Sequence, residues 1–547
     1  MPDVRIVLQA RLNSSRLPGK MLLPVGGIPL AVLCAKRAVT AQHPLVVATS
    51  LEKSDDLLAA CLSKFDTPCL RGDLNDVLGR FIQASSDMKD QDLIIRLTGD
   101  NPLVDSSFVN DILAFHKKSG GDYTRSFSPF DGLPYGLSAE VIRLGKLREI
   151  HQMDLPAEDR EHVTSYLTKK GDYALFSSPL KEDLSHLRAT IDSFEDYLRI
   201  AGIFEDVNED PICVSWQTLV ERLKRSPDAP AFKTPYKKAG LRVESRLALG
   251  TVQLGLDYGI ANRTGKPAMA NAKKILETAI AHGINFIDTA AAYGESEQVI
   301  GTCLNLAQKQ DLNIHTKLAT LDDLGGSPTP RAIKDAVEAS LYKSAYRLGL
   351  STLPCVMLHR WEHYTQHAGQ IWNHLRILKR ENLIKKLGAS VQSPAEALEA
   401  LAEPEIEFIQ IPFNICDWRW RESGFADARM RRQDIHIQAR SSLLQGVFLL
   451  PAAQWPVLDP TEADSFKKTL KSLVQTCNRK SVQDLCYAYV RSMEWIDSIV
   501  VGVETIEQLE ENLSLFNQSV LEDAAEIEKQ IPKLDEKFLN PALWPAR

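Results

Sequence analysis

Four residues in the second half of the chain have side chains that suit proton transfer to a carbonyl group: Asp288, Tyr293, Lys317 and His359. They follow short apolar runs that are typical of strands, at residues 284–287, 313–316 and 355–358. Because parallel strands of an α/β barrel end at one mouth, we expect these residues to meet there. An ammonium group beside a tyrosine favours the phenolate and lowers a pKa that is normally about 10. The four residues therefore predict carbonyl reduction, in which carbon receives a hydride and oxygen receives a proton.

Each of the four has an expected role in this chemistry. Lys317 is the expected source of positive charge, and Asp288 is expected to hold Lys317 in a salt bridge. His359 is expected to orient the carbonyl or to donate a hydrogen bond to it. The alternative is an ordinary ion pair beside a structural histidine. The order of the four residues, together with their positions at strand ends, favours the catalytic interpretation.

The segment around the first of these residues resembles a known family. Phe286-Ile-Asp-Thr-Ala-Ala-Ala-Tyr-Gly-Glu-Ser-Glu297 is similar to the aldo-keto reductase signature, and the resemblance covers roughly residues 245–530. It implies a nicotinamide cofactor, NAD(P)H. Positions matching those that bind the cofactor in the family are Ser390, Gln410, Arg440, Ser441, Gly502, Glu504, Gln508 and Asn512.

Within that set, the resemblance assigns Ser390 and Gln410 to the nicotinamide amide. Val391 stands where many members have asparagine, and Arg440 stands where many have a tyrosine that stacks on the ring. Members that prefer NADPH commonly place Lys or Arg in the segment matching residues 501–512, but this chain has none there. Acidic Glu504 is expected to repel a 2′-phosphate and to accept from a free ribose hydroxyl, which predicts that NADH serves at least as well as NADPH.

The first half of the chain begins with a strand-like run that leads into a basic loop. Residues 4–10 are followed by Arg11-Leu-Asn-Ser-Ser-Arg-Leu-Pro-Gly-Lys20, which contains three cations, two serines and a glycine. Such a loop suits phosphate binding by Arg11, Arg16 and Lys20. It matches neither the GxGxxG loop nor the P-loop. The alternative is a solvated basic loop without a ligand.

Further segments sharpen this interpretation. Residues 9–22, 71–80, 96–105, 160–164 and 190–196 look like the cytidylyltransferases that activate acidic sugars as CMP conjugates, closest to the spore-coat polysaccharide F-type branch. The resemblance spans roughly residues 3–220. It implies CTP and a sugar as substrates, with nucleotide-binding positions near Arg71, Asn75, Asp76 and Arg80. Asp100 and Asp192 end strand-like runs and are the expected ligands of Mg²⁺. Glu140 and His162 are expected to face the sugar.

Both halves alternate strand-like and helical patterns, which indicates α/β architecture. We expect strands at residues 4–10, 44–48, 93–97 and 187–191, and helices near 30–39, 76–86 and 194–204. In the second half, eight strands are expected near Leu247, Phe286, Ile314, Val356, Leu387, Ile409, Ile437 and Val500. The predicted fold is an N-terminal Rossmann-like nucleotidyltransferase α/β sandwich followed by a C-terminal (β/α)8 TIM barrel. Residues 225–238 contain three prolines without periodicity and predict a linker, so the expected domains are 1–232 and 240–547.

Length and composition exclude several classes of protein. A chain of 547 residues is too long for one ordinary core. Its net charge of −7 disfavours binding to nucleic acid or to an anionic membrane. The nine cysteines lack zinc-site spacing and suit a reducing cytoplasm. No apolar run is long enough to span a membrane, and no signal peptide is evident, so we expect a cytoplasmic protein.

These observations together predict a bifunctional enzyme of activated-sugar biosynthesis. One domain is expected to transfer CMP from CTP to a sugar acid or related sugar, and the other to reduce a carbonyl on a sugar intermediate. Two alternatives remain for the first domain. The first alternative is a glycosyltransferase that uses a nucleotide sugar. The second is a nucleotide-sensing or scaffolding module without catalysis. The sequence leaves the identity of the sugar, the direction of the redox step and the oligomeric state open.

Overall fold

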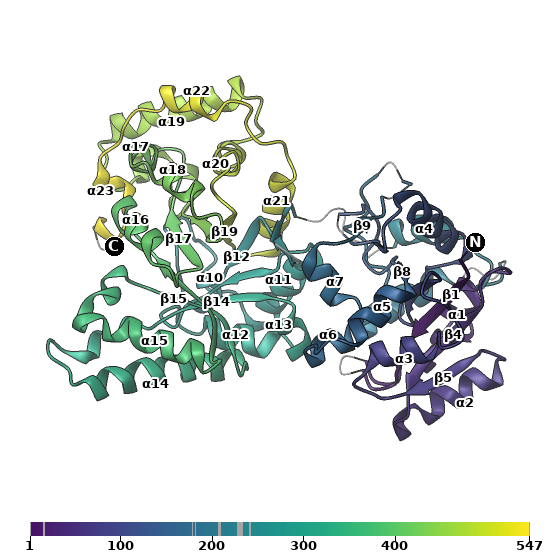
Figure 1. Cartoon of the computed structure of the whole chain (residues 1–547). Coiled ribbons are helices and arrows are strands. Elements are labelled where there is room, and N and C mark those ends of the chain that lie inside the picture. Colours follow the sequence, from purple (N-terminus) through teal and green to yellow (C-terminus); the bar gives the residue numbers. More distant parts are fainter. Residues whose placement is uncertain are drawn as a thin grey trace. The chain divides into compact units, whose positions relative to one another are not determined.

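The computed structural model forms two compact units, residues 1–233 and 234–547, which are described here one at a time (Figure 1). The structure describes residues 2–14, 17–128, 130–177, 179–180, 182–205, 209–226, 234–239 and 242–545. Half of the expected linker, at residues 227–233, lies outside the described residues. Its last part is a strand of the second unit, so the expectation that residues 236–238 are linker is wrong.

Unit 1 is built on one seven-stranded sheet in the order β5-β4-β1-β6-β8-β7-β9. The strands are β1 (Val4–Gln9), β4 (Leu45–Ser50), β5 (Cys69–Gly72), β6 (Leu93–Thr98), β7 (Tyr123–Arg125), β8 (Glu140–Arg143) and β9 (Ala174–Leu175). β1 runs parallel to β4 and β6, whereas β8 is antiparallel to β6. A small hairpin consists of β2 (Pro24–Val25) and β3 (Ile28–Pro29).

Helices cover both faces of this sheet, which makes it a three-layer α/β structure. Ile6 and Leu8 of β1 belong to one apolar cluster, and Val7 between them belongs to a second. Successive side chains of a strand point to opposite faces, so a strand that is apolar throughout must be buried on both sides. The helices are α1 (Leu30–Ala38), α2 (Asp56–Lys64), α3 (Val77–Gln83), α4 (Ser106–Ser119), α5 (Leu144–His151), α6 (Ala157–Glu161), α7 (Ser165–Lys170), α8 (Phe194–Ile203) and α9 (Trp216–Lys224).

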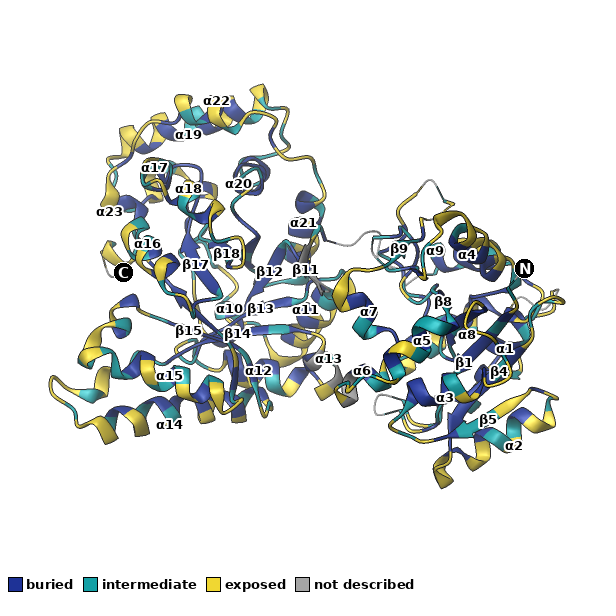
Figure 2. Cartoon of the chain, in the orientation of Figure 1, coloured by how far each residue is buried: buried dark blue, intermediate teal, exposed yellow. Residues whose placement is uncertain are grey.

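Unit 2 is a closed barrel of eight parallel strands, as the sequence predicts. The strands are β12 (Leu247–Gly250), β13 (Phe286–Asp288), β14 (Asn313–Lys317), β15 (Leu353–Leu358), β16 (Ile384–Ser390), β17 (Phe408–Pro412), β18 (His436–Arg440) and β19 (Ser498–Gly502). They are mostly buried, whereas the surrounding helices are buried on one side and exposed on the other (Figure 2). A TIM barrel gathers the carboxyl ends of its strands at one mouth.

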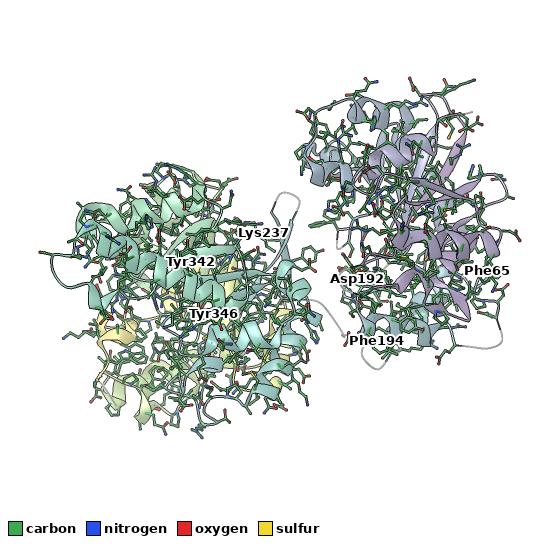
Figure 3. The ribbon with its side chains drawn as sticks, turned by 90° about the horizontal axis from the view of Figure 1, so that it is seen from below. Phe65, Asp192, Phe194, Lys237, Tyr342 and Tyr346 are labelled. Atoms are coloured by element: carbon green, nitrogen blue, oxygen red, sulfur yellow. The ribbon has the colours of Figure 1, made fainter. Side chains whose placement is uncertain are left out.

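The helices of unit 2 surround this barrel. They are α10 (Val252–Gly255), α11 (Met269–Ala281), α12 (Ser296–Cys303), α13 (Leu306–Gln310), α14 (Pro330–Leu348), α15 (Gln370–Arg380), α16 (Pro394–Ala402), α17 (Trp418–Glu422), α18 (Phe425–Met430), α19 (Pro460–Thr476), α20 (Val482–Arg491), α21 (Ile506–Phe516), α22 (Ala524–Gln530) and α23 (Glu536–Leu539). Helix α14 shows how the sequence sets such ends. Thr329 caps its first turn, Pro330 follows, and Gly349 ends it with φ +62°. Its outer face carries Tyr342 and Tyr346, which are 54% and 84% exposed (Figure 3).

A hairpin of β10 (Tyr236–Ala239) and β11 (Arg242–Ser245) precedes the first barrel strand. Lys237 of β10 forms an ion pair with Asp497, just before β19. Glu244 of β11 accepts from His436 Nδ1 at 2.9 Å, at the amino end of β18. The hairpin is therefore part of the barrel unit and lies at the end opposite the mouth.

One strand predicted in unit 1 does not form. The segment 187–191 has the apolar pattern of a strand, but it makes only an isolated bridge between Arg188 and Tyr135. Its backbone amide at Ile191 donates instead to Asp100 O at 3.0 Å, and Ile191 O accepts from Lys20 Nζ at 2.7 Å. The backbone of this segment therefore forms hydrogen bonds with residues of the site described below, and it does not pair along a neighbouring strand.

Candidate active sites

The structure brings the four residues of the barrel together at the carboxyl ends of their strands. Lys317 Nζ donates to Asp288 Oδ1 at 2.6 Å and to Tyr293 Oη at 3.2 Å. A third bond runs to the backbone oxygen of Thr289 at 3.1 Å. Lys317 is 1% exposed, so all three bonds form away from water. Burial alone would lower the pKa of Lys317, but Asp288 and Tyr293 outweigh it and raise that pKa above its usual range. Lys317 therefore stays charged beside the tyrosine.

His359 stands across the tyrosine ring. The rings of Tyr293 and His359 are 6.0 Å apart and nearly perpendicular. Burial, followed by the charges of Lys317 and Arg440, lowers the pKa of His359 to about 3, so its imidazole is neutral near pH 7. Its Nδ1 is buried without a hydrogen-bond partner. An unsatisfied buried acceptor is less costly than an unsatisfied N–H, which favours the tautomer that carries its proton on Nε2.

Gln410 connects Asp288 to the interior of the barrel. Its Nε2 donates to Asp288 Oδ1 at 2.7 Å and to Gln438 Oε1 at 2.9 Å. Its Oε1 lies 3.5 Å from the hydroxyl of Ser390. Gln438 itself donates to Ser498 at 3.1 Å. A buried polar network of this kind fixes the carboxylate that holds Lys317.

Arg440 is the last residue of β18, and Ser441 follows it at the mouth of the barrel. Arg440 Nη2 donates to the backbone oxygen of Val391 at 3.0 Å, which places it beside the end of β16. Burial lowers the pKa of Arg440, while Tyr293 and Tyr258 oppose that shift. Ser441 has φ +64°, a conformation that is uncommon for a residue other than glycine and is often found at functional sites.

The other positions with an expected cofactor role follow β19. Glu504 and Gln508 form a reciprocal pair, in which Gln508 Nε2 donates to Glu504 Oε2 at 2.7 Å and Gln508 Oε1 accepts from the Glu504 amide at 2.8 Å. A Cβ atom at Gly502 would meet the amide oxygen of Gln253 at 2.3 Å, so a larger residue there would require the Gln253 side chain to move. Asn512 is buried, and its Oδ1 accepts from Gln483 and Tyr487 of α20.

Sequence reasoning missed two side chains at this mouth, Gln253 and Tyr258. Both follow β12, and their position just after a barrel strand is the feature by which they could have been identified. Gln253 Oε1 is buried without a partner. The Tyr258 hydroxyl accepts from Gln445 Nε2 at 3.0 Å, and this side chain is 39% exposed.

In unit 1, Lys20 joins the two acids that were expected to bind a metal. Its Nζ donates to Asp100 Oδ2 at 2.8 Å and to Asp192 Oδ1 at 3.0 Å. The lysine is 5% exposed, and the two carboxylate side chains are 24% and 18% exposed. Asp192, labelled in Figure 3, also accepts from Arg188 at 2.8 Å. Two neighbouring carboxylates at the edge of the sheet are the oxygen ligands that suit a partly hydrated Mg²⁺ ion.

The remaining expected nucleotide residues have varied surroundings. Arg11 pairs with Glu161 of α6 at 2.9 Å, and Arg16 lies outside the described residues. Arg71 binds the β4–α2 connection, where it donates to Ser50 O at 2.8 Å and pairs with Asp56 at 2.8 Å. The backbone amide of Asn75 donates to Asp73 at 2.7 Å.

Asp76 and Arg80 lie at and just beyond the start of α3. Asp76 accepts from the Gly79 amide at 3.0 Å and so caps the helix. Any side chain at position 79 would meet that carboxylate at 2.4 Å. Arg80 is 3% exposed, its Nη1 reaches the Ala48 oxygen only at 3.5 Å, and its Nε has no partner. Burial and nearby Arg11 lower the pKa of Arg80.

Glu140, which was expected to face the sugar, is 8% exposed and accepts from Arg96 at 2.8 Å and from Tyr123 at 3.1 Å. In the barrel, Trp361 and Trp420 are buried, and Trp361 Nε1 donates to Glu399 at 2.7 Å. These contacts show that both tryptophans are packed within the barrel unit.

The described parts of the chain contain neither a cluster of metal ligands nor a helix that could span a membrane. There, His, Cys, Asp and Glu form no group of three or more that could hold a metal ion. Also within those parts, every helix is too short or too polar to cross a bilayer.

Comparison with known proteins gives two independent matches. The Aldo/keto reductase family matches residues 246–531, more than half of the chain, and the Cytidylyltransferase family matches residues 5–225. The spore coat polysaccharide biosynthesis protein SpsF of Bacillus subtilis is 34% identical over 241 residues, which are 42% of this chain and 97% of that protein. D-arabinose 1-dehydrogenase of Saccharomyces cerevisiae is 26% identical over 295 residues, 51% of this chain and 84% of that enzyme.

A third relative is 3-deoxy-manno-octulosonate cytidylyltransferase of Dichelobacter nodosus, 30% identical over 112 residues, 20% of this chain and 46% of that enzyme. Both family matches are to enzymes, and each falls on one of the two compact units. The chain is therefore a fusion that belongs to the SpsF-like cytidylyltransferases through its N-terminal unit and to the aldo/keto reductase family through its C-terminal barrel.

Proposed function

We propose that this chain is a bifunctional enzyme of activated-sugar biosynthesis. Unit 1 transfers CMP from CTP to a sugar acid or related sugar and releases pyrophosphate. Unit 2 reduces, or reversibly oxidises, a carbonyl on a sugar intermediate. The observation that carries the reductase proposal is the hydrogen-bonded series from Asp288 through Lys317 to Tyr293, with His359 facing the same tyrosine.

In the barrel, Tyr293 is the proposed proton donor to the substrate oxygen. Lys317 remains charged and stabilises the phenolate that forms when the proton leaves. Neutral His359 donates from Nε2 to the same oxygen and holds the carbonyl in place. When bound, NAD(P)H supplies the hydride. Asp288 keeps Lys317 from turning away, because it is itself held by Gln410.

The mouth of the barrel fits such a cofactor because several of its polar groups lack protein partners. Gln253 Oε1 and His359 Nδ1 are buried without partners among the described residues, and the absence of a side chain at Gly502 makes room for the Gln253 amide. In this proposal the nicotinamide end lies against Ser390, Gln410, Arg440 and Ser441. The adenosine end lies against Gly502, Glu504, Gln508 and Asn512.

In unit 1, Arg11, Arg16 and Lys20 are the proposed ligands of the triphosphate. Asp100 and Asp192 would hold Mg²⁺, which neutralises phosphate charge when bound. For this, Lys20 must exchange its two carboxylate partners for phosphate oxygens. The nucleoside is proposed to lie near Arg71, Asn75, Asp76 and Arg80. Arg80 supports this placement, since it is a buried cation whose hydrogen bonding is incomplete.

The relatives support a sugar as the shared substrate class. One similar enzyme is named for a sugar acid, 3-deoxy-manno-octulosonate, and another for the sugar D-arabinose. Fusion of two such units raises the local concentration of an intermediate that both of them use. We therefore propose that one sugar, or two successive intermediates, visit both sites.

A substrate screen of the full chain tests this proposal. Candidate sugars are incubated with CTP and Mg²⁺, and in parallel with NADH or NADPH, and products are identified by mass spectrometry. We expect a CMP-sugar with release of pyrophosphate, and a product that differs by two hydrogens in the reductase reaction. A glycosyltransferase would consume a nucleotide sugar without releasing pyrophosphate, and a sensing module would bind CTP without turnover. Either result would contradict the cytidylyltransferase proposal.

A further inference from the structure

Arg440 is a partly buried cation at the mouth of the barrel, and no described residue of opposite charge pairs with it. Its one hydrogen bond among the described residues runs from Nη2 to the Val391 backbone oxygen, and it forms no ion pair with any of them. Some other buried arginines form more hydrogen bonds. Arg37, for example, donates to the backbone oxygens of Pro211, Val214 and Leu103. Arg440, like Arg80 in unit 1, therefore has hydrogen-bonding capacity that the described residues do not use.

The acids nearest to Arg440 already have other partners. Asp288 accepts from Lys317 and Gln410, and Glu396 accepts from the backbone amide of Gln392. A desolvated cation without a counter-charge is costly, and a bound anion removes that cost. Guanidinium groups match carboxylates and phosphates particularly well, because their N–H groups form a planar fork.

The loop that follows Arg440 contacts the loop that follows β12. Gln445, five residues further along the chain, donates to the hydroxyl of Tyr258 at 3.0 Å. A Cβ atom at Gly446 would meet Ala261 at 2.5 Å, so glycine lets the loop after β18 pack against the loop after β12. Leu444 and Gln445 both have positive φ, at 47° and 53°. These residues hold Tyr258 near Tyr293 and Lys317, and its hydroxyl hydrogen remains available to a ligand.

We propose that Arg440 binds a carboxylate carried by the substrate, with Tyr258 as a second donor to the same group. The barrel would then act on a sugar acid or a related small oxo- or hydroxy-acid, and would discriminate against its neutral counterparts. This inference rests on the proposed reductase function and specifies its substrate class. Arg440 is then a specificity-determining residue that contacts the substrate beside the nicotinamide.

Position favours the substrate over the phosphates of the cofactor as the source of the anion. Arg440 ends β18 and touches the residue after β16, whereas the phosphate-bearing half of the cofactor is proposed to lie along β19 and α21. Among the groups that act on Arg440 electrostatically, Tyr293 is foremost after burial itself. The guanidinium is therefore close enough to Tyr293, the proposed proton donor, for their charges to interact.

Matched acids and amides test this proposal in the full chain. The probes are D-glucuronate with D-glucuronamide and pyruvate with pyruvamide, because the members of each pair differ mainly in charge. Binding to the NADH-loaded protein is followed by the change in NADH fluorescence, and reduction by its loss. We expect at least one acid to be favoured over its amide by tenfold or more in kcat/KM. Arg440→Gln should abolish this preference through KM, and Arg440→Lys should restore part of it.

The control variant is Arg360→Gln, which removes an exposed arginine that follows β15 and is paired with Asp322. It should leave the preference for the acid intact. Equal use of acid and amide by the parent, or failure of both acids to bind below 10 mM, would overturn the inference. A loss of NADH affinity in Arg440→Gln, with the acid preference unchanged, would assign the arginine to a cofactor phosphate. If NADH does not bind the parent chain, the proposed reductase function itself fails.

Discussion

The hydroxyl of Tyr293 is the group whose removal should separate binding from chemistry. It accepts from Lys317 and faces His359, so Tyr293→Phe removes the proton donor without opening a cavity. We expect kcat for carbonyl reduction to fall by about 10²–10⁴-fold, as is usual for loss of a general acid. NADH affinity, measured by fluorescence titration, should change little. Tyr342→Phe, which removes an exposed hydroxyl on α14, is the matched control. Unchanged turnover in Tyr293→Phe would exclude this role.

Asp100 provides the corresponding test in unit 1. Asp100→Asn keeps the shape of the side chain but removes one of the two charges that hold Lys20 and are proposed to bind Mg²⁺. We expect Mg²⁺-dependent pyrophosphate release to be lost while carbonyl reduction is retained. The exposed Asp154→Asn should retain both activities. Pyrophosphate release by Asp100→Asn at the parental rate would remove this residue from the metal site.

Asp131 should make unit 1 less stable as the pH rises. Burial raises the pKa of Asp131 to about 6, and its Oδ2 has no hydrogen-bond partner. A carboxyl whose pKa is higher in the folded state binds its proton more tightly there, so stability is greatest below pH 4. The contribution of Asp131 to the free energy of unfolding falls as the pH rises towards 6. Above that pH the full loss is about 3 kcal/mol.

The variant Asp131→Asn cannot ionise and should therefore be more stable than the parent at pH 7.5. The difference in the free energy of unfolding between the variant and the parent should shrink towards zero near pH 4. Urea unfolding of residues 1–233 at the two pH values measures it, with the exposed Asp154→Asn as control. A stability difference that is the same at both pH values would contradict the interpretation.

At the scale of elements, the start of helix α21 should decide the choice of cofactor. Glu504 and Gln508 bind each other there, and no Lys or Arg occurs between residues 501 and 512. A 2′-phosphate would lose a charge-assisted bond worth roughly 1.5–3 kcal/mol and would meet an acidic group instead. We expect NADH to bind at least as tightly as NADPH.

Substitution at this helix end sharpens the test. Glu504→Arg should strengthen NADPH binding by about tenfold or more, whereas Glu507→Arg, at an exposed position on the same turn, should have a much smaller effect. Fluorescence titration with both cofactors measures each affinity. NADPH binding that is tenfold tighter than NADH binding in the parent would refute the expected preference.

The elements also show which parts of the fold can be predicted from the sequence. All eight barrel strands were predicted, because a strand buried on both faces is an uninterrupted apolar run. In the sheet of unit 1, β5, β7, β8 and β9 were not predicted, because each has only two to four residues, and β7 and β8 end in the charged residues Arg125 and Arg143. Residues 187–191 have the apolar pattern without a partner strand, so pattern alone was misleading there.

The two candidate sites also differ in how far they could be predicted from the sequence. The residue types at the barrel mouth were predicted from strand ends and from the family resemblance, and the structure places Asp288, Tyr293 and Lys317 in direct contact. The partners of Lys20 were not predicted, because Asp100 and Asp192 lie 80 and 172 positions away in the sequence. Charge pairing over such separations depends on tertiary structure, which local patterns do not contain.

For the whole molecule, two compact units predict that each half folds alone. Each unit has its own buried core, and the hairpin of β10 and β11 belongs to the barrel. Fragments 1–233 and 234–547 should therefore be soluble, show cooperative unfolding by circular dichroism, and each retain one activity. A fragment that begins at residue 240 lacks β10 and the ion pair between Lys237 and Asp497, and should be less stable. Unfolded fragments from a folded parent would contradict this.

The charges around Lys20 have a consequence for how this fusion evolves. Lys20, Arg188 and Arg199 pair with Asp100, Asp192 and Asp196, so three cations balance three anions. Loss of any one member leaves the set with one uncompensated, partly buried charge, so a single substitution should lower the stability of unit 1 as well as its activity. A domain whose activity is no longer under selection should lose this set of six charged residues within a few substitutions. The intact set in this chain is what continued selection on the N-terminal half would maintain.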